Sequence, residues 1–252
     1  TNSTDLVLSV NTVLASKPVV GNDDASAPDV STAAEVKAIF AAYDAIRLAD
    51  GDGSVETLNL DRTAYETLGL GVAVDFTVDG EAKVSLLNSV LDTKSATVSN
   101  VETWAQLEAL AETVNGVIET AAGRTASPVL TQSDINALGV SGVTSDNLDA
   151  VVADIAEKAT TDVDSLSVLS GVVAAAVQAH GDAVARIEGY ADAPVGSAPS
   201  VSDYEDAGVT LSPPSGVNDT ELAQGLATVL AGSEISGTDV ATAADIQDLA
   251  DD

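Results

Sequence analysis

The chain of 252 residues contains no cysteine and no methionine, and aromatic residues make up only 3% of it. Without cysteine, the chain cannot form disulfide bonds, thiolate metal sites or a cysteine nucleophile. Hydrophobic residues still account for 45% of the sequence, and most of them are Ala, Val and Leu. We therefore expect real but small cores, because a unit of about 65 residues is close to the lower size limit for a self-sufficient core.

Basic residues are also scarce. Nine Lys and Arg stand against 40 Asp and Glu, which gives a formal net charge of −31. Nucleic-acid binding requires cationic neutralisation of phosphates, so nucleic acid is excluded as a partner, and anionic membrane surfaces are disfavoured. Such a surface attracts cations and keeps chains soluble. No stretch approaches the roughly 18–20 consecutive apolar residues of a membrane span, so no membrane insertion is expected.

The sequence repeats itself along its length. The string NSTDLVLSVNTVL at 2–14 returns as NDTELAQGLATVL at 218–230. The segment 65–69 matches 135–139 and then 204–208, and late in each unit an isoleucine recurs, as Ile46, Ile118 and Ile187. Self-similarity at a fixed period of about 70 residues indicates one supersecondary unit repeated in tandem.

Each unit has the pattern of three helices, because apolar residues recur at spacings of three and four and helix breakers separate the runs. The first helix is short and ends at a glycine in the left-handed conformation. These glycines are Gly69, Gly139 and Gly208, and capping boxes are predicted at Thr63–Glu66, Thr131–Asp134 and Ser202–Glu205. The second helix is clearest at 147–155. The third is expected to open near Val30, Val101, Val163 and Val240, and to be longer by about two turns after Val163.

The predicted fold is therefore all-α, a tandem array of three-helix modules. The predicted domains are a partial module at 1–51 with helices two and three, a module at 52–123, a module at 124–192, and a module at 193–252 that is truncated in its last helix. Both ends fall inside the repeat frame, so we expect a piece of a longer polypeptide or a subunit completed by its neighbours. A short strand or extended loop at 72–78 is an open alternative around Phe76.

The best candidate for specific chemistry is the loop DGDGSVETLNLD at 50–61. It places oxygen-bearing side chains at loop positions 1, 3, 5, 7 and 12, namely Asp50, Asp52, Ser54, Glu56 and Asp61. This spacing is typical of helix–loop–helix calcium sites. Position 6, however, is Val55 rather than glycine, and position 12 is Asp rather than Glu. The alternative is a polar helix end followed by a loop, and calcium is the one cofactor that we consider.

No residue pattern points to an enzyme. His180 is the single histidine, and no motif places a serine and an acid beside it. We expect His180 at the surface or between helices. Trp104 stands at helical spacing from Leu107, Leu110 and Val114, which favours a core position. The acidic residues are too numerous for any carboxylate pair to stand out, and we expect no catalytic activity.

The segment SDINALGVSGVTSDNL at 133–148 resembles a motif in the tandem repeats of very large, acidic, adhesin-like surface proteins of bacteria. The three-helix layout is also similar to that of the GA module of bacterial surface proteins. The resemblance implies an extracellular location at the cell surface and a structural or adhesive role. We expect a spacer or a self-assembling filament or surface-layer component whose partner is itself, head to tail, or a neighbouring repeat. The alternative is a calcium- or protein-binding module of a large adhesin.

Overall fold

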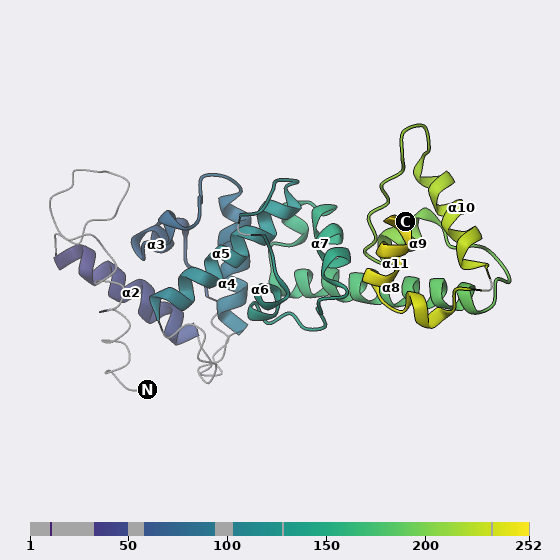
Figure 1. Ribbon diagram of the computed structural model, residues 1–252. Helices are drawn as coiled ribbons and strands as arrows, with labels where there is room; N and C mark the ends of the chain where they lie inside the picture. The colour runs from purple at the N-terminus through teal and green to yellow at the C-terminus, as the bar shows by residue number, and fades with distance from the viewer. Residues whose placement is uncertain are drawn as a thin grey trace. The chain divides into compact units, whose positions relative to one another are not determined.

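The computed structural model describes Asn11 and residues 33–49, 58–93, 103–127, 129–232 and 234–251. All regular elements within these ranges are helices, and they contain no strand (Figure 1). The expected all-α class is thus confirmed for the described part of the chain. The chain divides into two compact units, of which the first comprises residues 1–139 and 158–169 and the second comprises residues 140–157 and 170–252.

Five α-helices within the described ranges lie wholly in the first unit. They are α2 (Ala33–Ala49), α3 (Arg62–Thr67), α4 (Gly80–Thr93), α5 (Trp104–Ala121) and α6 (Gln132–Ala137), accompanied by the 3-10 helices η1 (Leu70–Val72) and η2 (Thr160–Asp162). Helix α2 contacts α3 and α4, α4 contacts α5, and α5 contacts α6. Tyr43, Tyr65 and Leu107 are among the largest side chains that these contacts bury completely.

The second unit contains α7 (Leu148–Ala156), α9 (Val201–Asp206), α10 (Asp219–Leu230), η3 (Gly237–Val240) and α11 (Ala243–Asp251). Helix α8 (Leu166–Asp192) contributes residues 166–169 to the first unit and 170–192 to the second. One apolar core joins the C-terminal half of α8 to α9, α10, η3 and α11. Its buried members are Ala183, Val184, Ile187, Ala191, Tyr204, Ala207, Val209, Ala223, Leu226, Leu230, Val240 and Ile246.

The short helices α3, α6 and α9 are each six residues long and begin behind a side-chain cap. The predicted capping box of Thr131 and Asp134 is confirmed at α6. The other two predictions are wrong by two residues, since Asp61 caps α3 and Ser200 forms a capping box with Asp203 at α9. The earlier cap gives each helix six residues before its glycine, whereas the later one would leave only a single turn.

The three predicted turn glycines do adopt the left-handed conformation that ends a helix. Their φ angles are 92° at Gly69, 98° at Gly139 and 81° at Gly208. An L-residue with a side chain meets a steric penalty in this region of backbone space, so glycine is the residue that allows the chain to turn there. The sharp change of direction after each short helix therefore follows directly from the sequence.

The third helices of the repeats begin close to the predicted valines. Helices α5, α8 and α11 each start three residues after such a valine, and Val163 and Val240 are buried. Helix α8 has 27 residues against 18 in α5, which confirms the predicted lengthening. Trp104 is half-buried at the start of α5, where its indole Nε1 donates to the Leu68 carbonyl at 2.9 Å. The predicted neighbours Leu107, Leu110 and Val114 are core residues.

Helix α8 is the one helix in the described ranges that is long and apolar enough to cross a membrane. Of its most apolar 18-residue window 33% is buried, and the C-terminal half of α8 contributes four side chains to the core of the second unit.

Residues 72–78 form no strand, although two of their apolar side chains, Val74 and Phe76, are buried while Val78 is 43% exposed. After η1 the chain continues in turns, and Val74 and Phe76 point into the core of the first unit. The Phe76 ring stacks on Tyr65 with ring centroids 6.0 Å apart. The partial alternation thus reflects an irregular segment that buries two side chains, at 74 and 76.

The two tyrosines of the short helices differ in the partner of the phenolic hydroxyl. Tyr65 and Tyr204 are both fully buried. The Tyr65 hydroxyl donates to Asn88 Oδ1 at 2.6 Å, whereas the Tyr204 hydroxyl has no hydrogen-bond partner among the described residues. A buried hydroxyl without a partner loses the hydrogen bonds that water gave it in the unfolded chain.

We expect the Tyr65→Phe and Tyr204→Phe substitutions to have opposite effects on stability. The first should destabilise the protein by about 1–2 kcal/mol, because it removes a buried hydrogen bond. The second should be neutral or stabilising, because it removes an unsatisfied polar atom while keeping the ring. Urea unfolding of the two variants measures the difference, and equal losses would show that the Tyr204 hydroxyl has a partner in solution.

Candidate functional site

Of the five predicted calcium ligands in the loop at 50–61, the structure describes only Asp61. The other four, Asp50, Asp52, Ser54 and Glu56, lie outside the described residues. The Asp61 side chain caps α3 by accepting a hydrogen bond from the Ala64 N–H at 2.9 Å. Within the described residues, no three His, Asp or Glu side chains are arranged to hold a metal ion. Calcium binding at 50–61 stays a prediction, and Asp61 has a structural role without it.

We expect Asp61→Asn to retain the stability of the parent chain and Asp61→Ala to lose about 1 kcal/mol, because Asn caps a helix as well as Asp does and Ala does not. A calcium ligand would behave differently, since either change removes a carboxylate from the ion. Calorimetric titration with calcium chloride, combined with thermal unfolding, distinguishes the two roles. Heat of binding in the parent that disappears in Asp61→Asn would make Asp61 a ligand as well as a cap.

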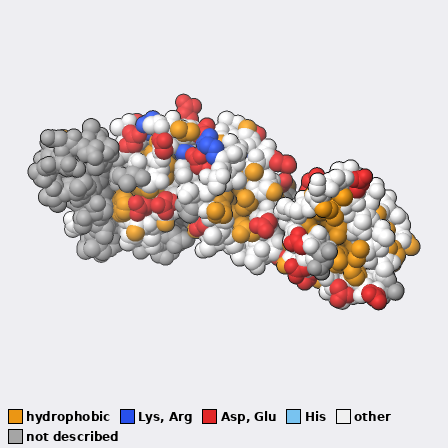
Figure 2. Space-filling view, turned by 45° about the horizontal axis from the view of Figure 1, so that its top comes forward, with side chains coloured by type: hydrophobic (Ala, Val, Ile, Leu, Met, Phe, Trp, Pro, Cys, Tyr) orange, Lys and Arg blue, Asp and Glu red, His pale blue; other side chains and the backbone are white. Residues whose placement is uncertain are grey.

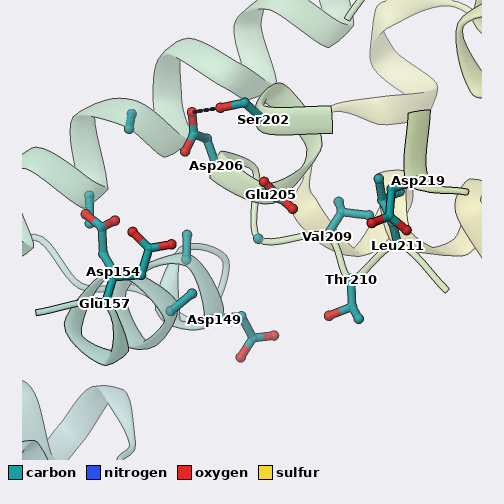
Figure 3. Close-up of a pocket in the computed structure, with 15 residues that line it drawn as sticks. Asp149, Asp154, Glu157, Ser202, Glu205, Asp206, Val209, Thr210, Leu211 and Asp219 are labelled. Atoms are coloured by element: carbon teal, nitrogen blue, oxygen red, sulfur yellow. Dashed lines mark hydrogen bonds between the residues drawn. The ribbon is translucent and has the colours of Figure 1, made fainter. Parts of the chain in front are cut away.

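The second unit contains a groove of about 530 Å³ (Figure 3). It lies between α7, α8, α9 and the segment that connects α9 to α10. Small residues of α7 and α8, such as Ala150 and Ala176, form part of its wall. Six acidic residues line the rest, namely Asp149, Asp154, Glu157, Glu205, Asp206 and Asp219. We call this feature the acidic groove.

The charged groups of the acidic groove are all carboxylates. No basic or histidine side chain lines it, and its one serine, Ser202, donates to Asp206 at a long 3.4 Å. Figure 3 shows Asp154 and Glu157 on one side of the groove and Asp219 on the other, so the carboxylates are spread along it. The groove can attract cationic groups by its field.

A second polar arrangement lies nearby in the same unit. Asp146, in the turn before α7, accepts from the Ala243 N–H at the start of α11 at 2.9 Å. Its other carboxylate oxygen lies 3.1 Å from Nε2 of His180 on α8. His180 is 6% exposed, and its Nδ1 has no partner among the described residues. The expectation that His180 lies between helices is confirmed, and Asp146 links the two helices through one carboxylate.

The first unit holds a compact network of charges. Lys83 on α4 is 0% exposed, and its Nζ donates to the Asp75 carbonyl at 2.9 Å and to Glu119 Oε1 at 2.8 Å. Arg124 bridges Glu119 and Asp79. The hydrogen bond from Arg124, with further contributions from Lys83, lowers the pKa of Glu119. In turn, the hydrogen bonds to Glu119 and Asp79 raise the pKa of Arg124. These contacts join α4 to the end of α5 and the turn that follows it.

Charge is unevenly distributed on the surface. On the face drawn in Figure 2, acidic side chains occur over much of the described surface, whereas the basic side chains in view gather in one part. A second cavity, of about 1030 Å³, runs along α4 in the first unit and is lined by both apolar and polar side chains, among them Phe76, Val84 and Asp92. Neither cavity contains an arrangement of groups that defines a reaction.

Sequence reasoning missed the acidic groove, the Asp146–His180 contact and the Lys83 network. Each of them joins segments far apart in the chain, such as residues 146 and 243 or 83 and 119. One signal was available for Lys83, since a single lysine among the apolar positions of α4 requires an acidic partner. Comparison of the chain with protein families, with curated proteins and with solved structures gives no match.

Proposed function

We propose that the chain is a structural array of helical repeats that acts as a spacer or self-assembling component at a cell surface. The order of helices supports this proposal. Three helices follow one another as α3–α4–α5, α6–α7–α8 and α9–α10–α11, and each set opens with a helix of six residues. The short helices begin at residues 62, 132 and 201, close to the period of the sequence repeat. One supersecondary unit repeated in tandem is the basis of spacer and scaffold proteins.

The recurring burial within these units is the observation that carries the proposal. Each short helix buries one side chain four positions before its left-handed glycine and a second directly before it. These pairs are Tyr65 and Leu68, Ile135 and Leu138, and Tyr204 and Ala207, all at 0–1% exposure. A repeated core of this kind specifies a framework, and the described cavities add no catalytic constellation to it.

The charge of the chain suits an extended array in an ionic medium. A net charge of −31 on 252 residues keeps separate arrays apart, and cations from the medium screen the repulsion within each array. The acidic groove is consistent with this role as part of a solvated surface. We propose no catalytic activity and no nucleic-acid partner for the chain.

Antibodies raised against the purified chain test the proposed location. They should label intact cells of the source organism without permeabilisation, and labelling only after permeabilisation would contradict a surface role. Electron microscopy of the purified chain in physiological salt tests self-assembly. Fibres or ordered arrays would support a filament or surface-layer component, and single particles at all concentrations would leave the spacer role alone.

A calcium- or protein-binding module of a large adhesin is the alternative function. It depends on the loop at 50–61, of which the structure describes only the last four residues. The calcium titration with Asp61→Asn therefore also tests this alternative.

A further inference from the structure

The three long helices α2, α5 and α8 share one spacing of buried residues. Counted from the recurring isoleucine, the residue itself and the residues four and seven positions before it are all buried. These triplets are Ile39, Ala42 and Ile46 in α2, Ala111, Val114 and Ile118 in α5, and His180, Ala183 and Ile187 in α8. Spacings of three, four and seven place each triplet on one face of its helix.

The helix that follows each long helix in the chain packs against it. Helix α2 contacts α3, α5 contacts α6, and the C-terminal half of α8 shares a core with Tyr204 and Ala207 of α9. The short helices have only six residues, which is too few for a helix to be stable in water without tertiary packing. The long helix of the preceding repeat supplies part of this packing, alongside contacts within the repeat such as those of α3 with α4 and of α9 with α10.

We propose that the C-terminal face of each long helix is the docking surface for the short helix of the next repeat. The proposal rests on the array proposed above and names the partner within it. That partner is a six-residue helix with two buried side chains, closed by a left-handed glycine. At the two ends of the described chain the folded core is then offset from the sequence repeat by one helix. It joins α2 to α3–α5 in the first unit, and the C-terminal half of α8 to α9–α11 in the second.

The second unit gives the most complete view of such a core. Ala183, Val184, Ile187 and Ala191 come from α8, and the rest of the cluster comes from α9, α10, η3 and α11. A polar contact reinforces it, since Asp192 at the end of α8 accepts from the Gly237 N–H of η3 at 2.6 Å. Side chains of α8, which precedes the connector at 193–200, thus complete the core that α9, α10 and α11 form.

The position of His180 fits the same scheme. It occupies the place in its triplet that Ile39 and Ala111 occupy in the other long helices. Burial of a polar ring is costly without a partner, and Asp146 supplies that partner from the turn before α7. The partner of His180 thus comes from its own repeat, and the contact of α8 with the core of α9 rests on Ala183 and Ile187 of the triplet.

A cut in the connector between α8 and α9 tests the proposal on the full chain. A protease recognition sequence is inserted between Gly196 and Ser197, both of which are exposed. After cleavage in physiological salt, the two pieces should co-elute as a 1:1 complex in gel filtration at micromolar concentration. In the Ile187→Asp variant, which places a charge in the core, the cut pieces should separate.

Ala185→Asp is the matched control, because it adds the same charge two residues away at an exposed position of α8. Its cut pieces should stay together. If Ile187→Asp fails to fold before cleavage, Ile187→Ala replaces it and should weaken association by at least about tenfold. Separation of the parent pieces, or equal retention by the variants at 185 and 187, would overturn the docking surface. The cell-surface labelling is independent of this outcome, so the two proposals fail separately.

Discussion

Replacing Glu119 by Gln should destabilise the first unit by about 3–5 kcal/mol, because the change leaves a fully buried lysine without its counter-charge. Lys83 is 0% exposed, and Glu119 is the one carboxylate to which the structure gives it a hydrogen bond. A Gln side chain keeps the size and one acceptor of Glu119 but not its charge. Denaturant unfolding of the full chain, followed by the fluorescence of Trp104 in the same unit, measures the loss.

Glu66→Gln is the matched control for this experiment. Glu66 pairs with Arg62 on α3, but both side chains are at least 40% exposed. Exposed pairs contribute little, so the control should cost less than about 0.5 kcal/mol. In the double variant Lys83→Met, Glu119→Gln, much of the stability should return, because no buried charge remains. A Glu119→Gln protein as stable as the parent would show that Lys83 reaches water in solution.

The same network predicts how stability depends on pH. The contacts to Arg124 and Lys83 lower the pKa of Glu119 in the folded chain below its ordinary value. The stabilising contribution is therefore complete above the ordinary pKa and is lost as the pH falls through the lower, folded pKa. The difference in unfolding free energy between the parent and Glu119→Gln should accordingly shrink in acid.

Replacing Gly208 by Val should cost more than the same change at Gly216, although both glycines are left-handed, with φ of 81° and 92°. The backbone penalty is shared and amounts to about 1–2 kcal/mol. At Gly208 a Cβ atom would also lie 3.4 Å from the backbone nitrogen of Ala150 on α7, whereas nothing lies within 4 Å at Gly216. A Cβ at this distance is in ordinary contact, so the two γ-methyl groups of Val have to find space against α7, and such overpacking adds about 1–3 kcal/mol.

Thermal unfolding of the two glycine variants separates the backbone term from the packing term. The expected total loss is about 2–5 kcal/mol for Gly208→Val and about 1–2 kcal/mol for Gly216→Val. Equal losses would mean that α7 moves away from the turn without cost. A loss at Gly216 but none at Gly208 would contradict the packing of the turn on α7.

The glycine turns and the long helices could be predicted from the sequence because they depend on local residues. At α6 the sequence determines both ends of the helix. Gly139 ends it with a left-handed residue, and the Thr131–Asp134 capping box begins it. At α9 both Ser200–Asp203 and Ser202–Glu205 fit the capping pattern. The choice between them depends on the length of helix that the core around Tyr204 supports, which is a tertiary property.

The charged sites could not be predicted, because the chain offers too many acidic residues. Asp146 gains its role from Ala243 and His180, which lie 97 and 34 residues away. In the same way, Lys83 finds Glu119 rather than another acid because α4 and α5 pack side by side. The spacing of acidic residues in the loop at 50–61 is a local pattern, but Asp61 is the one predicted calcium ligand that the structure describes. The position of Asp61 is explained by a second local rule, because its side chain caps helix α3.

Amide hydrogen exchange on the full chain, comparing the parent with Ile187→Ala, tests most directly whether a long helix belongs to the core of the following repeat. Loss of the Ile187 side chain leaves a cavity among α8, α9, α10 and α11 and should cost about 2–5 kcal/mol. The account predicts faster exchange in α9, α10 and α11, with α5 unchanged. Faster exchange confined to α7 and α8, with α9–α11 as protected as in the parent, would contradict it.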